Sequence, residues 1–465
     1  MDYISHTKKD IEKIKNFLDI DKIEDLLKDI PKDLILNEYK FLNLARGKSE
    51  FEIIKLADEI QTMNNIDNKF TYLGAGIYNH FIPSVVDALA SRVEFLTAYT
   101  PYQAEISQGT LQWIFEYQSS IANLTGMEIV NASLYDAANS LFEAVKIAIK
   151  IGEKNRNVNK KNILISKYIN PEYLKVLKTS FKLNDTINRY EKSINIIFFE
   201  NFDDLSKKID EKAACVIISN PNFLGQVENI EEMTNLAHQH NALSILNIYP
   251  ISLGILKKPG EMDVDIVTGE GQSLGMPMCI GGATFGIFAT KKEFIRLIPG
   301  RIVGKTTDKN GKEGFVLTMQ AREQHIRREK AFSNICSNHA NYALRALIYL
   351  SALGDKGLET VAILSMQNAY YFAEKLLNIT KSGKKVFNIV FEKNYINEFV
   401  LEYNFENFEE FDKKLKENDI VLGLKLNIFE EFFKEKYIKH WLVCATELNT
   451  KENIDETIKK IQNLI

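Results

Sequence analysis

The chain has 465 residues, which exceeds the usual size of one compact core, so two or three domains are expected. Its 45% hydrophobic and 26% charged residues are typical of a soluble globular protein, and a net charge of −4 gives no basis for binding nucleic acid. No apolar run approaches the roughly 20 residues that span a bilayer, and the N-terminus lacks the apolar centre of a signal peptide. The four cysteines are scattered without C-x-x-C spacing, which argues against disulfides and structural zinc and favours the cytoplasm.

Residues 1–65 are predicted to form an N-terminal helical arm. Apolar residues recur there at helical spacing, and Pro31 separates two such helices. The first stripe is Ile11, Ile14, Phe17 and Leu18, and the second is Ile23, Leu26, Leu27 and Ile30. We expect this arm to pack on the body of the protein or on a partner.

Residues 66–328 are predicted to form a large α/β domain. Small and aromatic residues replace the charged ones from Tyr72 to Pro83, and a strong helix follows Gly109. Gly126 suits the position just after the last turn of that helix. Asp136 suits the N-cap of a helix over 137–150.

Strands and helices then alternate for more than a hundred residues. Strands are predicted at 127–131, 162–166, 194–199, 214–219, 242–248 and 264–268, and helices at 171–181, 203–211 and 230–240. This alternation predicts a mostly parallel, doubly wound sheet with both faces covered. Since ligands bind at the carboxyl ends of such strands, four loops are expected to meet at one edge. These are 131–137, 219–225, 247–254 and 268–275.

Residues 329–465 are predicted to form a small C-terminal α+β domain. A long helix is expected over 329–353, ending near Gly354, and a second long helix follows it. Short strands are expected near 386–391, 397–403, 420–425 and 439–445, before a terminal helix.

Several motifs resemble one family in a continuous order from about residue 70 to the end. They include Phe-Ile-Pro-Ser-Val-Val-Asp (81–87), Thr-Ala-Tyr-Thr-Pro-Tyr-Gln (97–103), Glu-Ile-Ser-Gln-Gly (105–109), Asn-Ala-Ser-Leu-Tyr-Asp (131–136), Pro-Gly-Arg-Ile-Val-Gly (299–304) and Gln-Ala-Arg-Glu-Gln-His-Ile-Arg-Arg (320–328). They resemble the first-subunit form of glycine dehydrogenase (decarboxylating), the P-protein of the glycine cleavage system. The resemblance implies a type I fold of pyridoxal-phosphate (PLP) dependent transferases. It also implies an α2β2 heterotetramer with a paralogous second subunit.

The turn after the strand at 264–268 contains no lysine. It reads Gly-Glu-Gly-Gln-Ser over 269–273, whereas the family's second subunit carries the PLP lysine in a His-Lys turn after a similar strand. Counting from Asp265 near the start of the strand places Ser273 at the position of that lysine and Gln272 at the position of the histidine. The preceding segment, 243–249, also lacks the Asp or Glu that would pair with the cofactor's ring nitrogen. We therefore expect PLP to be held by the partner subunit and not by this chain.

The resemblance implies that the partner decarboxylates glycine and passes the aminomethyl group to a lipoylated H-type carrier protein. This chain would form one wall of the reaction channel. The expected wall residues are Tyr72, Gly74, Gly76, Tyr78, Thr100, Tyr102, Gln103, Glu105, Ser107, Gln108, Arg322, Gln324 and His325. Arg301 is expected to help dock an acidic carrier, and no metal site is expected.

Three questions stay open at this point. The segments Thr100–Gln103 and Arg322–His325 combine polar groups, aromatics and a cation, which suits either a composite active site or a subunit interface. The chain could also be a stand-alone PLP enzyme that uses Lys291 or Lys292, which follow the strand expected at 284–289. A catalytically inert structural or regulatory paralogue is the third possibility.

Overall fold

The structure is a computed structural model. It describes residues 6–34, 47–64, 70–96, 99–153, 160–187 (of 182–187 the backbone only), 194–278, 282, 284–391, 394–429 and 432–465. The chain divides into two units, Met1–Asn68 and Lys69–Ile465. None of the helices in these ranges is both long and apolar enough to cross a membrane.

The first unit consists of short helices in the region where a helical arm is predicted. They are α1 (Lys8–Leu18), η1 (Ile23–Leu27), η2 (Lys32–Leu34) and α2 (Glu50–Met63). The two longer helices begin with capping boxes, in which Thr7 and Ser49 each accept a hydrogen bond from the backbone three residues later. None of these four helices has a buried residue, so their apolar stripes are not covered within this unit.

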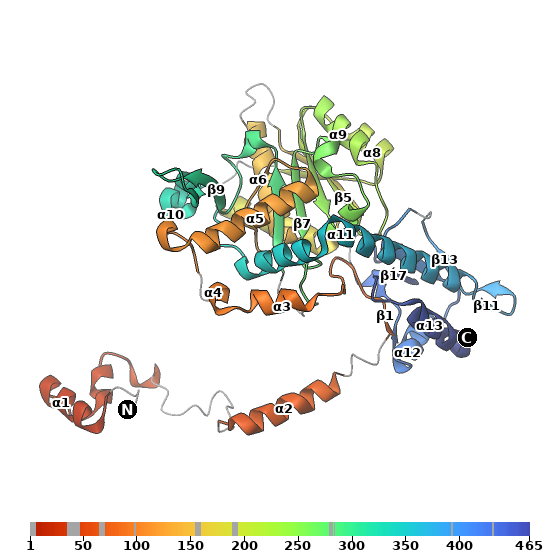
Figure 1. Cartoon of the computed structure of the whole chain (residues 1–465). Coiled ribbons are helices and arrows are strands. Elements are labelled where there is room, and N and C mark those ends of the chain that lie inside the picture. The colour runs from red at the N-terminus through yellow and green to blue at the C-terminus, as the bar shows by residue number, and fades with distance from the viewer. Residues whose placement is uncertain are drawn as a thin grey trace. The chain divides into compact units, whose positions relative to one another are not determined.

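The second unit is built on a seven-stranded sheet, shown in Figure 1. Its strands, in spatial order, are β2 (Ile129–Val130), β8 (Gly286–Thr290), β7 (Ile266–Glu270), β6 (Leu243–Ile248), β5 (Ala213–Asn220), β3 (Asn162–Ser166) and β4 (Asn195–Phe199). The five strands from β7 to β4 are parallel, and β8 runs antiparallel to both of its neighbours. The prediction of a mostly parallel sheet is therefore confirmed.

Helices cover both faces of this sheet. They are α5 (Gln108–Thr125), α6 (Ala137–Glu153), α7 (Pro171–Ile187), α8 (Phe202–Lys208) and α9 (Ile230–Gln239). Alternate strand residues enter opposite cores, so Ile245 packs with α6 and α7 while Leu246 packs with α5 and α9. Both predicted caps are confirmed, because Gly126 has a φ of 71° and Asp136 accepts a hydrogen bond from the Asn139 N–H at 2.7 Å.

Two features between the sheet and the C-terminal region differ from prediction. A hairpin of β9 (Ile302–Thr307) and β10 (Glu313–Thr318) was not predicted. The long helix α11 (Ala340–Leu377) begins at residue 340, so the predicted start at 329 is wrong. Tertiary hydrogen bonds hold the backbone before it, because the Tyr135 hydroxyl accepts from two consecutive N–H groups, those of Cys336 and Ser337. Gly354 is non-helical, with φ 60° and ψ −174°, and divides α11 near the predicted end.

A four-stranded antiparallel sheet forms the C-terminal region. Its order is β13 (Phe387–Ile389), β14 (Glu398–Tyr403), β17 (His440–Cys444) and β16 (Leu424–Lys425). It packs with the second half of α11, α12 (Phe408–Glu417) and α13 (Lys451–Leu464) around a core that includes Phe399 and Trp441. β1 (Phe70–Thr71) pairs with β15 (Ile420–Val421), so the start of the second unit is joined to this region.

The remaining elements are short. They are α3 (Ser84–Ala90), α4 (Val93–Leu96), α10 (Gln324–Arg327), the hairpin of β11 (Thr380–Lys381) and β12 (Lys384–Lys385), and the 3-10 turns η4 (Ala104–Ile106), η5 (Pro250–Gly254), η6 (Pro259–Met262), η7 (Lys292–Phe294), η8 (Gln320–Arg322), η9 (Arg328–Lys330) and η10 (Leu426–Ile428).

Candidate functional site

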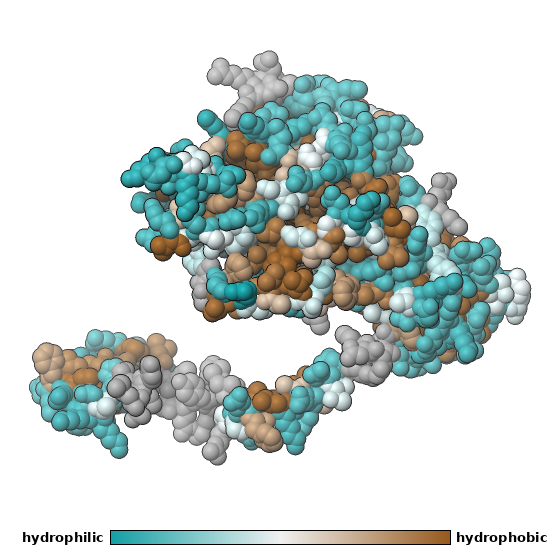
Figure 2. Space-filling view, in the orientation of Figure 1, coloured by the Kyte–Doolittle hydropathy of each residue, from teal (hydrophilic) through white to brown (hydrophobic). Residues whose placement is uncertain are grey.

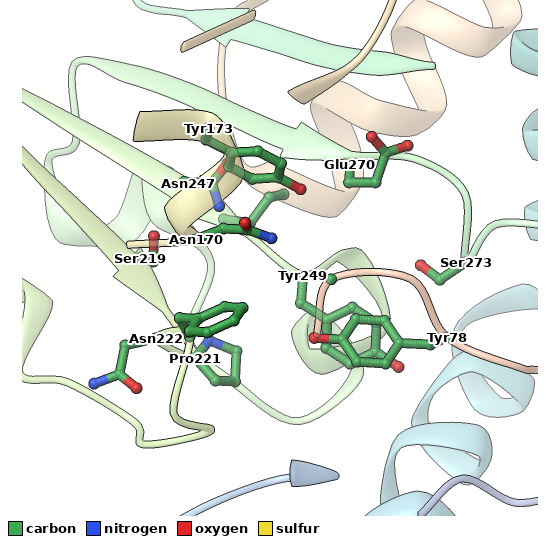
Figure 3. Close-up of a pocket in the computed structure, with 13 residues that line it drawn as sticks. Tyr78, Asn170, Tyr173, Ser219, Pro221, Asn222, Asn247, Tyr249, Glu270 and Ser273 are labelled. Atoms are coloured by element: carbon green, nitrogen blue, oxygen red, sulfur yellow. The ribbon is translucent and has the colours of Figure 1, made fainter. Parts of the chain in front are cut away.

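A small cavity of about 40 Å³ lies at the carboxyl ends of β5, β6 and β7, as expected for a doubly wound sheet (Figure 3). Three of the predicted loops line it, through Ser219, Asn247 and Ser273. The fourth, 131–137, reaches its edge through the Ala137 N–H, which donates to Glu270 at 3.4 Å. The predicted convergence of the four loops is therefore confirmed.

The cavity offers neither the amine nor the ring-nitrogen carboxylate expected of a PLP enzyme at Ser273 and in the segment 243–249. Ser273 stands at the expected lysine position, and its Oγ has no hydrogen-bond partner among the described residues. Asn247 lies at the end of β6, and its Oδ1 accepts from Thr268 at 3.4 Å. Neither residue can bind PLP covalently or form an ion pair with its ring nitrogen.

A carboxylate takes the position where a cofactor phosphate would bind. Glu270, which is 8% exposed, accepts from the Ala137 N–H at the start of α6 and from the Gln272 N–H at 3.1 Å. The N-terminus of a helix attracts anions, so a phosphate would be expected to bind at the start of α6. Burial raises the pKa of Glu270 to about 8, with a further contribution from Asp136, although the backbone hydrogen bonds lower it. No Lys, Arg or His lines the cavity in the described part of the chain, so these residues do not fit PLP.

The predicted residues Gly76 and Tyr78 form one wall of this cavity. The Tyr78 backbone exchanges two hydrogen bonds with the Gln272 side chain, at 2.9 and 3.0 Å. A Cβ at Gly74 would lie 2.3 Å from Glu398 Oε1, so the chain passes too close to β14 for a side chain there. This segment therefore connects the cavity to the C-terminal sheet.

Tyr72, which is also predicted to belong to the channel wall, does not line this cavity. Its hydroxyl hydrogen-bonds Thr457 at 2.8 Å, and its ring stacks on Phe372 with centroids 4.1 Å apart. Tyr72 is thus part of the C-terminal core, because that core covers its apolar ring and satisfies its hydroxyl.

A second group of residues, the aromatic–cation cluster, consists of Thr100, Tyr102, Arg301, Arg322, Glu323 and His325. The Tyr102 ring lies 5.8 Å from the Arg301 guanidinium carbon and 5.5 Å from the His325 ring. Tyr102, Glu323 and His325 line a surface cavity of about 480 Å³, together with Gln324. The structure therefore brings the 100–103 and 322–325 segments together. The segment at Gly76 lines the other cavity, at β5–β7.

Several polar groups in the aromatic–cation cluster are buried without a hydrogen-bond partner. These are Thr100 Oγ1, Arg301 Nε, Arg322 Nε and Glu323 Oε1. Each such group costs about 1–3 kcal/mol when it is left unsatisfied. Burial accordingly lowers the pKa of Arg322 and raises that of Glu323. The cluster can therefore accept hydrogen bonds from, and donate them to, a further molecule.

Two residues of the predicted site, Arg301 and Gln108, use their side chains to hydrogen-bond backbone groups of this chain. Arg301 is 4% exposed and donates to the Cys336 carbonyl at 2.8 Å and to Asn338, so it is not placed to dock a carrier at the surface. The Gln108 side chain bonds both the N–H and the C=O of Phe315, each at 2.8 Å, and so joins α5 to β10. Gln103 and Glu105 are exposed, and Ser107 is half-buried just before α5.

Lys291, considered above as an alternative PLP lysine, lies outside the cavity. Its ammonium group pairs with Asp265 at 2.6 Å and Asp263 at 2.7 Å. These contacts raise its pKa even though burial lowers it, so the amine is held in its protonated, non-nucleophilic form.

Sequence reasoning missed several residues at the cavity. Glu270 could have been predicted from the sequence, because it is an acidic residue at the carboxyl end of an otherwise apolar strand. Glu398 and Glu447 had none, because they come from the C-terminal region and reach the site only through the fold. His80 bridges Tyr249, at the cavity, to Glu447 at 2.7 Å.

Comparison with known proteins agrees with this architecture. Residues 1–461 match the family described as glycine cleavage system P-protein. A probable glycine dehydrogenase (decarboxylating) subunit 1 of Maridesulfovibrio salexigens is 41% identical over 98% of each chain, and one of Dictyoglomus turgidum is 42% identical over 100% of this chain and 99% of that protein. A solved structure of glycine decarboxylase (P-protein), in inhibitor-bound form, is 35% identical over 100% of each chain, with a TM-score of 0.85.

More distant structures show the fold alone. A sphingosine-1-phosphate lyase of Burkholderia pseudomallei shares 10% identity at a TM-score of 0.64, over 92% of each chain. A glutamate decarboxylase of Lactobacillus brevis shares 13% identity at a TM-score of 0.65 over 93% of this chain and 95% of that one. The predicted type I PLP fold is confirmed, and the full-length matches show that this chain belongs to the glycine cleavage system P-protein family.

Proposed function

We propose that this chain is the subunit of a glycine dehydrogenase (decarboxylating) that does not hold PLP. The observation that carries the proposal is the cavity at β5–β7, which has Ser273 at the expected lysine position and no Lys, Arg or His among its described lining residues. A paralogous second subunit holds the cofactor, which supplies the electron sink for the decarboxylation of glycine. The relatives named subunit 1 support a two-chain enzyme.

The contribution of this chain to catalysis is to complete the partner's active site with the aromatic–cation cluster. Arg322 donates to the carbonyls of Ile298 and Gly300 at 2.5 and 2.6 Å, and so fixes the loop that carries Arg301. Tyr102 and His325 stand at the surface above these cations. The unpartnered groups of the cluster then gain partners from the other subunit or from substrate, and the aromatic rings exclude water from the joint site.

The surface that meets the second subunit includes the exposed apolar side chains of α3, α4 and η4. Val85, Leu89, Val93, Leu96 and Ile106 are all exposed. Figure 2 shows an apolar patch between α3 and α11, and a groove of about 690 Å³ lies there. Patches of this kind mark subunit interfaces. The segment leads along the chain to the aromatic–cation cluster, which supports one partner covering both. The α2β2 stoichiometry of the proposed assembly rests on the family resemblance.

The remaining steps of the proposal rest on the family's chemistry. The aminomethyl group left after decarboxylation passes to a lipoylated H-type carrier protein, and the enzyme works in the cytoplasm without nucleic acid or membrane as a partner. No group of three or more His, Cys, Asp or Glu residues in the described part of the chain could hold a metal ion, and the proposal assigns the covalent cofactor contact to the second subunit.

The test is the exchange of bicarbonate carbon into glycine, with PLP and lipoylated carrier present. It compares the chain alone, the second subunit alone and the two mixed. We expect exchange in the mixture and none with this chain alone. Exchange catalysed by this chain alone would contradict the proposal, because the reaction would then need a cofactor site in this chain. Equal exchange by the second subunit alone and by the mixture would identify the chain as an inert paralogue.

A further inference from the structure

The cavity at β5–β7 has an acidic side chain and no cation among its described lining residues, which is the opposite of a phosphate site and favours a different ligand. Asp136 lies close enough to Glu270 to raise the pKa of Glu270, and both carboxylates also raise the pKa of the Tyr173 hydroxyl. No Lys, Arg or His is among the described residues that line it. A positive group is therefore the ligand that such a cavity stabilises.

Two hydroxyl groups in this cavity lack partners. Ser219 and Ser273 are each 3% exposed, and neither Oγ has a hydrogen-bond partner in the described part of the chain. Figure 3 shows Glu270 and Ser273 on one side of the cavity and Ser219 on the other. Buried polar groups are normally satisfied, so each of these oxygens is available to accept a hydrogen bond from a ligand in the cavity.

Aromatic rings complete the walls. Tyr78, Tyr173, Tyr249 and Phe223 line the same cavity, and ring faces attract cations that carry little hydration. A volume of about 40 Å³ accommodates roughly three water-sized groups, at about 10–15 Å³ each. That is enough for a few heavy atoms and too little for a phosphorylated ring.

From this geometry we propose that the cavity binds a small organic ammonium ion, with Glu270 as its counter-ion and the hydroxyls of Ser219 and Ser273 as acceptors. A zwitterionic amino acid is disfavoured, because its carboxylate would meet Glu270 and Asp136 without a lining cation. Divalent metals are also disfavoured, since the described residues contain no group of three His, Cys, Asp or Glu that could hold one. The inference concerns this chain alone and does not require the proposed glycine dehydrogenase activity.

The first experiment uses thermal unfolding of the full-length protein with methylammonium chloride as the probe. A ligand that binds only the folded state raises Tm, and the rise continues with concentration. Tetramethylammonium chloride, which is too large for the cavity, controls for ionic strength, and potassium chloride and glycine are tested alongside. We expect a rise in Tm that is specific to methylammonium. Equal rises with tetramethylammonium would overturn the proposal, and an equal rise with potassium would assign the site to an inorganic ion instead.

Single substitutions test whether methylammonium binds in this cavity. Glu270→Gln and Ser273→Ala are each expected to weaken methylammonium binding, the first by about tenfold or more because it removes the counter-ion. Glu172→Gln is the control, since Glu172 is exposed on α7 beside the cavity residue Tyr173. An unchanged Tm response in Ser273→Ala and Glu270→Gln would place any binding elsewhere.

Proton release provides a measurement that needs no variant. Below about pH 8 Glu270 is largely protonated, so binding of a cation beside it displaces a proton. Calorimetric titration in two buffers with different ionisation enthalpies is expected to give different apparent enthalpies at neutral pH. Identical enthalpies in the two buffers would show that Glu270 is not the counter-ion and would overturn the proposal.

Discussion

The hydroxyl of Tyr78 donates a 2.6 Å hydrogen bond to the carboxylate of Glu398, which lies 320 residues later in the chain. The other oxygen of that carboxylate accepts from the Ala75 N–H at 2.6 Å. Both side chains are buried, so this contact fixes the loop over the cavity to β14 of the C-terminal sheet. The contact makes the geometry of the cavity depend on the C-terminal region.

The stability of the folded protein is expected to depend on the ionisation of Glu398. Burial raises the pKa of Glu398 to about 7, although its two hydrogen bonds lower it. Since the folded pKa lies above the unfolded value of 4.5, the folded protein binds more protons, and stability falls as pH rises from about 4.5 through 7. The difference corresponds to a loss on the order of 3 kcal/mol. Glu270 acts in the same direction, so Glu398→Gln is expected to reduce this loss without abolishing it.

Denaturant unfolding between about pH 5 and pH 8 measures this effect in the wild type and in Glu398→Gln. Glu402→Gln is the matched control, because Glu402 lies on the same strand but is partly exposed. A parallel pH dependence in wild type and Glu398→Gln would contradict the assignment. An equally reduced dependence in the control would do the same.

Local sequence patterns were sufficient to predict the strands of the central sheet. The strand Asn162–Ser166 was predicted with both ends correct, because five buried residues lie between charged and polar neighbours. Gly126 and Asp136 were predicted as helix ends for reasons of backbone conformation and capping, which depend on a few adjacent residues. Such features require no knowledge of tertiary contacts.

Features that depend on distant residues were not predictable in this way. Residues 331–339 are held out of the helix by contacts with Tyr135 and Arg301, and no local signal shows this. The contacts of Tyr72 with Phe372 and Thr457 in the C-terminal core likewise have no local signal in the sequence. The aromatic–cation cluster was anticipated as two segments, and its unpartnered groups became visible only in the structure.

Restoring the lysine alone is not expected to create a PLP enzyme. In Ser273→Lys the cofactor would still lack an acidic partner for its ring nitrogen in the segment 243–249. Glu270 would still occupy the Ala137 N–H at the start of α6, and no cation among the described lining residues would bind the phosphate. Incubation with PLP, borohydride reduction and mass spectrometry of peptides measures covalent attachment. We expect no stoichiometric adduct at position 273, and no change in labelling between wild type and Lys291→Arg. A stoichiometric adduct at position 273 would show that the cavity accepts the cofactor after all.

Gln108 and Gln103 are expected to differ sharply in their effect on stability. Gln108→Ala removes both hydrogen bonds to the Phe315 backbone and leaves buried groups unsatisfied, at a cost of about 1–3 kcal/mol. Gln103→Ala changes an exposed side chain five residues earlier and is expected to shift stability by less than about 0.5 kcal/mol. Denaturant unfolding of the two variants tests this, and equal losses would show that the join between α5 and β10 contributes nothing.

Arg322 is expected to support turnover by fixing the loop that contains Ile298 and Gly300. In Arg322→Lys a single ammonium group replaces the planar fork that reaches both Ile298 and Gly300, so the loop that carries Arg301 loses its support. We expect a fall in glycine–bicarbonate exchange of about tenfold or more in the mixed enzyme, with assembly unchanged by size-exclusion chromatography. Arg327→Lys is the control, because Arg327 is exposed and its side chain donates to the Ala321 carbonyl and not to the Ile298–Gly300 loop. Full exchange by assembled Arg322→Lys would support a scaffold role.

The apolar surface of α3, α4 and η4 is expected to control assembly with the second subunit. Val93 is 66% exposed, so Val93→Glu removes little buried packing from the chain itself, and its stability should change by less than about 0.5 kcal/mol. A charge placed within an apolar interface would be buried without a partner, which costs several kcal/mol on association. Val176→Glu on α7 is the matched control, since it adds the same charge to a partly exposed valine remote from this segment. We expect only Val93→Glu to dissociate the mixed subunits in analytical ultracentrifugation. Unchanged assembly would place the interface elsewhere, because a charge at a buried contact could not be tolerated without a measurable loss of affinity.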